Sequence, residues 1–126
     1  MKELYMLRPL TSAEAYLQEA DELLEKGDVV QASEKYYKAV EEAIKILAVE
    51  NKISTLNEAK AKGSWDLETL NKAINELAKI YGERIIIDWS ASVSLVTTNL
   101  SPNSIKDVVK YVRDIVNLAS ANKRLD

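Results

Sequence analysis

The chain has 126 residues, of which 47% are hydrophobic, and this is enough for one domain with a buried core of its own. It contains neither Cys nor His, which excludes disulfides, thiolate nucleophiles, the usual zinc sites and catalysis by imidazole. The formal net charge of -3 argues against a protein that coats nucleic acid by bulk electrostatic attraction.

Glycine is equally sparse and occurs only at Gly27, Gly63 and Gly82, each alone. The glycine-rich dinucleotide fingerprint and the phosphate-binding P-loop both need several closely spaced glycines, so neither is present. Residues 1–10 lack a basic stretch followed by a long apolar run, and no later segment has the roughly 20 uncharged apolar residues of a membrane span. We therefore expect a cytoplasmic protein that holds no cofactor and does not enter a membrane.

The first half of the chain predicts a helical hairpin. Thr11 and Glu14 have the spacing of a capping box, and apolar residues recur after them at helical intervals until Gly27. Asp28 then begins a second helix, which runs towards Asn51. Because the connection between the two helices is so short, they are expected to pack antiparallel.

Residues 52–63 form a polar segment with scattered apolar positions, and its pattern fits either a fraying helical extension or a loop. A third helix follows it. Ser64 or Asp66 can cap this helix, its apolar residues form a single stripe, and Gly82 closes it.

Residues 83–100 are rich in β-branched side chains, which favour strands, but the spacing of the apolar residues favours a helix. The residues that recur at intervals of three and four form the predicted core stripe: Ile86, Trp89, Val93, Val96 and Leu100. We therefore predict a fourth helix over this segment.

Ser101 followed by Pro102 indicates the start of a fifth helix, which frays near Asn122. The fold class expected from these elements is all-α, an up-and-down bundle of about five helices. Residues 11–122 then form a single domain, preceded by an N-terminal extension over residues 1–10 and followed by a C-terminal tail over residues 123–126.

Acidic residues on the first helix offer the only hint of a metal site. Glu19, Glu22 and Glu25 lie near one helix face and would suit a divalent ion in a hydrolase. Such sites need a second acidic pair from a later helix, and the sequence has none at the required spacing. A solvated acidic face is therefore the favoured interpretation, and no metal site is predicted.

Basic residues of the later helices are candidates for phosphate or RNA contact. Asp107 and Asp114 interleave with them, which favours ion pairs within the last helix over an open basic surface. The candidate residues are Arg84, Lys106, Lys110 and Arg113.

The predicted fourth helix has a second apolar row. Ile87, Ala91 and Leu95 follow each other at intervals of four, roughly opposite the core stripe. A helix that is apolar on two faces must be covered twice or leave a patch exposed. We take these three residues as a candidate dimer interface, with complete burial inside the chain as the alternative.

The hairpin from Ala15 to Lys45 closely resembles the crenarchaeal PaREP family of uncharacterised proteins. The resemblance lies in the segments AYLQEA and KGDVVQASEKYYKAVEEAIK, is specific over residues 12–50, and continues more loosely to the last helix. The PaREP family in turn resembles, more distantly, the HEPN superfamily of helical bundles.

This resemblance implies a HEPN-like bundle, often dimeric, in a superfamily whose active members are metal-independent RNases or partners of nucleotidyltransferases. The active RNases carry an Arg followed a few residues later by a His. Because this chain has no His, neither Arg84 nor Arg113 can complete that pair.

These observations predict that the protein is not an enzyme. The favoured hypothesis is a non-catalytic interaction protein that acts as a homodimer or with a protein partner such as a nucleotidyltransferase. The alternative is a HEPN-type protein that binds RNA or a nucleotide weakly without cleaving it.

Overall fold

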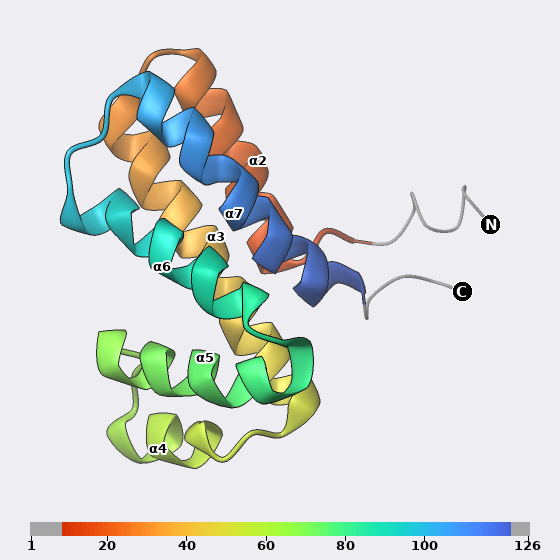
Figure 1. Ribbon diagram of the computed structural model, residues 1–126. Coiled ribbons are helices and arrows are strands. Elements are labelled where there is room, and N and C mark those ends of the chain that lie inside the picture. The colour runs from red at the N-terminus through yellow and green to blue at the C-terminus, as the bar shows by residue number, and fades with distance from the viewer. Residues whose placement is uncertain (1–8, 122–126) are drawn as a thin grey trace.

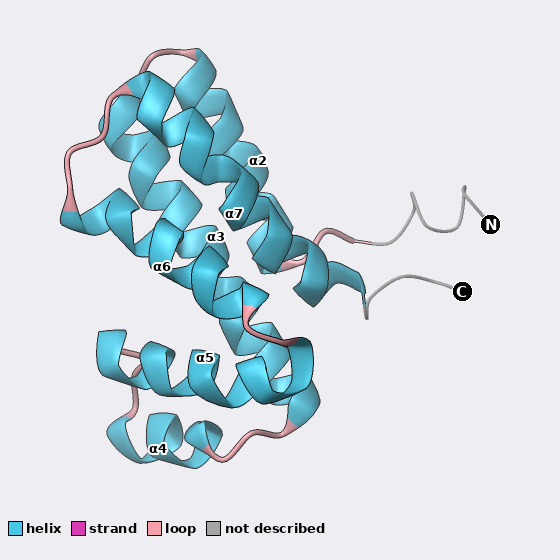
Figure 2. Cartoon of the chain, viewed as in Figure 1, coloured by secondary structure: helices cyan, strands magenta, loops and turns pink. Residues whose placement is uncertain are grey.

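The computed structural model describes residues 9–121, and over that range every regular element is a helix (Figure 2). This confirms the all-α class. The predicted tail, residues 123–126, and most of the predicted N-terminal extension lie outside the described residues. The helices are α2 (Ser12–Glu25), α3 (Val29–Asn51), α4 (Thr55–Lys62), α5 (Leu67–Tyr81), α6 (Arg84–Thr97) and α7 (Pro102–Ala121).

The long helix α3 organises the fold, because it contacts each of the other five helices named above. Helices α2, α3, α6 and α7 run side by side, whereas α4 and α5 lie together across one end of them (Figure 1). The prediction of about five helices in an up-and-down bundle is therefore wrong in two respects. The described chain has a sixth helix, α4, and the α4–α5 pair runs across the bundle.

The predicted helix starts are confirmed by their hydrogen bonds. The Thr11 hydroxyl accepts from the backbone N–H of Glu14 at 3.1 Å, and the Glu14 carboxylate accepts from the Thr11 N–H at 2.8 Å. The Asp28 and Asp66 carboxylates accept from the backbone N–H groups of Gln31 and Thr69 and so cap α3 and α5, without the reciprocal bond of a capping box. Between α2 and α3, Gly27 adopts a φ of 82°, a conformation that glycine reaches without steric cost.

Helix α4 occupies most of the segment that the sequence left undecided. The Glu76 carboxylate of α5 accepts hydrogen bonds from the backbone N–H groups of Ser54 at 3.1 Å and Thr55 at 2.8 Å, and from both of their hydroxyls. A carboxylate from another helix thus satisfies donors at the start of α4. Because this partner is 21 or more residues away, local sequence patterns do not reveal it.

The buried face of helix α6 coincides only in part with the predicted stripe: Trp89 is buried, and Val93 and Leu100 pack against the core. The predicted stripe included Ile86 and Val96, but these side chains are 36% and 48% exposed. With three isoleucines in succession, the apolar pattern does not show which of them faces the core. The buried face also includes two polar residues, whereas the predicted stripe was entirely apolar. The buried residues of α6 are Ile85, Asp88, Trp89, Ser92 and Leu95.

Polar groups on this buried face satisfy one another in part. The Ser92 hydroxyl donates to the Asp88 carbonyl at 2.7 Å, and the Trp89 indole N–H donates to Asn71 of α5 at 2.6 Å. Trp89 also lies against Tyr37 of α3, with ring centroids 5.9 Å apart. The core therefore joins α6 to both α3 and α5.

No helix between residues 9 and 121 combines the length and apolar character that a membrane crossing requires.

Candidate functional site

Beyond its first residue, Arg84, the solvent-facing side of α6 carries no charge. We call the residues Ile86, Ile87, Ser90, Ser94 and Thr97 the α6 face, because at about 100° per residue they fall within one arc of roughly 100°. Ile87 is 55% exposed, and Ser90 and Thr97 are also exposed. The only charged residues of α6 are Arg84, at its first position, and Asp88, which is buried. An uncharged exposed helix face is unusual in a chain with 29% charged residues.

The candidate interface row does not form one surface. Ile87 is exposed and Ala91 is partly buried, but Leu95 is only 4% exposed and belongs to the core of its own chain. The reason is the rotation of α6 relative to the prediction, which turns Leu95 inward. Of the three residues, Ile87 is the one that the α6 face retains.

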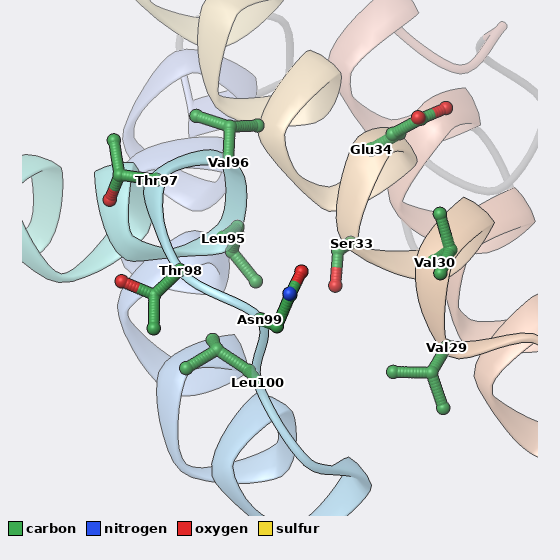
Figure 3. A pocket seen from close by; sticks show the side chains of 10 residues that line it. All are labelled: Val29, Val30, Ser33, Glu34, Leu95, Val96, Thr97, Thr98, Asn99 and Leu100. Carbon is green, nitrogen blue, oxygen red and sulfur yellow. The ribbon is translucent and has the colours of Figure 1, made fainter.

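A groove of about 630 Å³ lies beside the end of α6 (Figure 3). Val29, Val30, Ser33 and Glu34 of α3 form one wall, and residues 95–100 form the other. Asn99 and Ser33 point toward each other across it (Figure 3). Glu34 is the one charged residue among those that line it, so this groove suits uncharged groups better than phosphate.

The predicted basic residues divide between two places. Lys106, Lys110 and Arg113 of α7 line one pocket of about 630 Å³, together with Asp21, Leu24 and Glu25 of α2 and Tyr36 of α3. Arg84 lies elsewhere, in a pocket between α6, α7 and the end of α5. The structure therefore brings three of the four candidates together and separates the fourth.

Arg113 is held by an ion pair between helices. Its guanidinium donates to Asp21 Oδ1 at 2.7 Å, and the same oxygen accepts a hydrogen bond from the Tyr36 hydroxyl at 2.6 Å. Burial raises the pKa of Tyr36, and the hydrogen bond to Asp21 raises it further, so the phenol stays protonated. The expected pairing within α7 is thus wrong for Arg113.

Lys106 and Lys110 remain the available cations of this pocket, since residues 9–121 provide neither of them with an ion pair. Lys110 Nζ lies over the Tyr111 ring, 5.1 Å from its centroid. Because Asp21 and Glu25 line the same pocket, its charge is mixed. Only weak attraction for phosphate follows from this arrangement.

Arg84 bridges two carboxylates. Its Nη2 donates to Asp114 Oδ2 of α7 at 2.7 Å, and its Nε lies 3.7 Å from Asp88 Oδ1, too far for a hydrogen bond. Asp88 is fully buried, and within the described part of the chain neither of its oxygens has a hydrogen-bond donor. Burial raises the pKa of Asp88 to about 7, and the nearby Asp114 carboxylate adds to the shift.

Asp88 is not among the predicted site residues, although the sequence contains a signal for it. Asp88 is a carboxylate inside an otherwise apolar run, directly after three isoleucines and directly before Trp89, and it follows Arg84 by four residues. A charged group at a position of this kind is buried only when something nearby compensates its charge. The second carboxylate near it, Asp114, lies in a different helix and could not be inferred.

The acidic row of α2 does not converge on a metal site. Glu19 forms an ion pair with Lys35 of α3 at 3.3 Å, and Glu25 lines the pocket that also contains the basic residues. From Pro9 to Ala121, no three Asp, Glu, His or Cys side chains are grouped so that they could hold a metal ion.

Comparison with known proteins identifies relatives over most of the chain. The crystal structure of a Sulfolobus solfataricus protein is 43% identical, covers 88% of this chain and 95% of its own, and superposes with a TM-score of 0.84. A solution structure of an open-reading-frame product from the same structural-genomics target is 41% identical, covers 88% of this chain and 90% of its own, and has a TM-score of 0.77. No curated protein shows significant similarity. The model of the archaeal PaREP1/PaREP8 family matches residues 8–116, and the chain therefore belongs to that family.

Proposed function

We propose that this PaREP1/PaREP8 protein is a non-catalytic interaction protein that works as a homodimer, with the α6 face as the contact surface. The observation that carries the proposal is the absence of charge from that face. Ile86 and Ile87 place apolar area in solvent, and the hydroxyl side chains of Ser90, Ser94 and Thr97 complete the face. Removing water from a surface of this composition costs little free energy, because no charged group has to be desolvated.

A second copy of the chain suits this surface better than an unrelated charged partner. In a two-fold symmetric dimer the same patch lies on both sides of the interface, so a charged patch would face its own charge. The α6 face avoids this repulsion. Small side chains at Ser90 and Ser94 would also let two helices approach closely, as small residues do at helix contacts.

Ile87 is the residue best suited to test this proposal. It is 55% exposed, so Ile87→Glu introduces a charge without disturbing the core. Val49→Glu is a matched control because Val49 is 61% exposed on α3, in a depression that Glu42, Lys45 and Glu50 help to line. Leu95→Glu would not serve, since Leu95 is buried.

Light scattering and circular dichroism on these two variants give the decisive comparison. The proposal requires Ile87→Glu to be a folded monomer while Val49→Glu keeps the mass of the unmodified protein. A dimer that survives Ile87→Glu with full helicity would rule out the α6 face as the contact surface.

A weak RNA or nucleotide binder is the second candidate function, and the pocket beside α7 favours it. Lys106 and Lys110 lack ion pairs within residues 9–121 and line the same pocket as Tyr36. A phosphate held by these lysines would be repelled by Asp21 and Glu25, which keeps the expected affinity low. Lys110→Glu should abolish such binding, whereas Lys79→Glu on α5 should not.

The HEPN-like relationship is part of the same proposal and rests on the resemblance of the α2–α3 hairpin. A nucleotidyltransferase is the corresponding candidate for a protein partner. Purification from native cells at low salt, followed by identification of bound protein and RNA, would separate this partner from the RNA-binding alternative.

A further inference from the structure

A second pocket, of about 360 Å³, opens between α6, α7 and the end of α5. Its polar wall consists of Asp88 and Asp114, with Arg84 above them. Its apolar wall consists of Ile85, Leu118 and Ala121. This pocket is separate from the α6 face and from the pocket that holds Lys106 and Lys110.

The charges around this pocket do not balance. Two carboxylates, Asp88 and Asp114, face one guanidinium, that of Arg84, which leaves one negative charge without compensation. The other titratable side chains at the site, Tyr81 and Tyr111, are phenols and supply no positive charge. Within the part of the chain that the structure describes, the site therefore lacks one positive charge.

Asp88 shows where that charge is missing. Its side chain is completely buried, and neither oxygen accepts a hydrogen bond from any residue in the described range. A buried carboxylate without donors is costly, because it has lost its water and gained nothing equivalent. Arg84 does not supply the donors: its Nε is 3.7 Å away, and its side chain is 71% exposed.

Arg84 therefore covers the carboxylates, and its contact with Asp88 is the longer of its two ion pairs. Its strong hydrogen bond, at 2.7 Å, goes to Asp114, which is itself 36% exposed. Displacing the guanidinium from Asp88 breaks no hydrogen bond. A ligand that enters beside Arg84 would meet the more exposed Asp114 first, and would reach Asp88 by taking the place of the guanidinium 3.7 Å from it.

We propose that this pocket binds the ammonium group of a small aliphatic amine, with Asp88 and Asp114 accepting its hydrogen bonds. An ammonium group carries three donors and the missing positive charge. Ile85, Leu118 and Ala121 would contact the carbon chain of the ligand, which a bare metal ion would leave unused. A metal ion would also find only two carboxylates here, and residues 9–121 hold no group of three such ligands.

A proton competes with the amine for the same carboxylates. When Asp88 binds a proton, the charge of the site is balanced. Because burial raises the pKa of Asp88 to about 7, the proton is lost as the pH rises through neutrality. Amine binding should therefore strengthen over the same range and release a proton at the lower pH values.

Isothermal titration of the full chain with putrescine, at about pH 6 and about pH 8, tests this site. We expect binding that is at least about tenfold tighter at the higher pH and that weakens by about tenfold or more in Asp88→Asn and Asp114→Asn. Arg84→Ala should bind more tightly than the unmodified protein, because it removes the cover and the competing charge. Asp107→Asn, which neutralises an exposed carboxylate of the same helix α7, should bind as the unmodified protein does.

Three results would overturn the proposal: no heat of binding at either pH, an equal loss in Asp107→Asn, or weaker binding in Arg84→Ala. Magnesium chloride alone is titrated in parallel. If magnesium binds with the same variant pattern and putrescine does not, the pocket is a metal site and the amine assignment is wrong. Circular dichroism checks that each variant is folded. If Asp88→Asn unfolds, the other two variants still test the proposal: putrescine should bind more weakly to Asp114→Asn and more tightly to Arg84→Ala.

Discussion

Asp21 and Arg113 are 92 residues apart in the sequence, yet the Asp21 carboxylate accepts a 2.7 Å hydrogen bond from the Arg113 guanidinium. The same carboxylate oxygen holds the hydroxyl of Tyr36, which is only 1% exposed. One acidic side chain of α2 thus joins the first helix of the bundle to both α3 and α7.

The first prediction follows from this junction. Asp21→Ala should lower the free energy of unfolding by about 1–3 kcal/mol, because it leaves the buried Tyr36 hydroxyl without its acceptor. Arg113→Ala should cost less than about 1 kcal/mol, because the Asp21–Arg113 pair is partly exposed and screened by solvent. Urea denaturation of both variants checks the order, and a larger loss in Arg113→Ala would contradict it.

The second prediction concerns the pH dependence of stability. The pKa of Asp88 is raised from 3.8 to about 7 in the folded chain, so between these values the folded state binds a proton that the unfolded state has released. The contribution of Asp88 to stability is therefore greatest at low pH and declines as the pH rises through this window. Asp88→Asn should remove this decline and make the protein more stable than the unmodified chain above neutrality.

Urea denaturation at several pH values measures this effect. The capping residue Asp66 serves as an internal reference, because its contribution to stability rises with pH whereas that of Asp88 falls. Hydrogen bonds from the Thr69 backbone and hydroxyl lower the pKa of Asp66 to about 2, so its contribution is lost only in strong acid. A protein whose stability does not fall between about pH 5 and about pH 8 would contradict the role assigned to Asp88.

The third prediction is an absence of RNase activity. The catalytic pair of active HEPN RNases needs an imidazole, and the chain has no His. Clean protein incubated with labelled RNA should release no more product than buffer does. Cleavage that disappears in Arg84→Ala or Arg113→Ala would show that another group replaces the imidazole.

The fourth prediction concerns RNA binding. Any such binding should be weak and fall steeply with salt, since the net charge is -3 and only a few cations can reach phosphate. With Lys106, Lys110 and Arg113 as contacts, the logarithm of the binding constant should fall by about 3 or less per tenfold increase in salt. Filter binding over a salt series measures the slope, and tight binding at high salt would contradict the proposed contacts.

Local signals in the sequence predicted the helices well, because the caps that define them are local. Thr11, Asp28 and Asp66 each form the expected hydrogen bond with a residue three positions ahead. Contacts between helices were not predictable in this way. Glu76, which accepts the backbone hydrogen bonds at the start of α4, is more than 20 residues away in the sequence. The partners of Arg84 and Arg113 lie in other helices.

The orientation of α6 shows a second limit of sequence patterns. Apolar residues occupy most of its circumference, so periodicity alone gave a stripe that includes the exposed Ile86 and Val96. The packing of Trp89 against α3 and α5 and the burial of Asp88 beside α7 decide which face turns inward.

The candidate basic surface was predicted only in part. Lys106, Lys110 and Arg113 share one side of a single helix, so their spacing in the sequence already places them together. Arg84 belongs to another helix, and its position relative to them depends on how the helices pack.

The molar mass of the unmodified protein in solution tests the central claim most directly. Light scattering over a concentration series should give a mass of twice the 14.1 kDa of one chain, because the uncharged α6 face is expected to be covered by a second copy. A mass of one chain at every concentration would contradict the homodimer and leave the α6 face without the partner proposed for it.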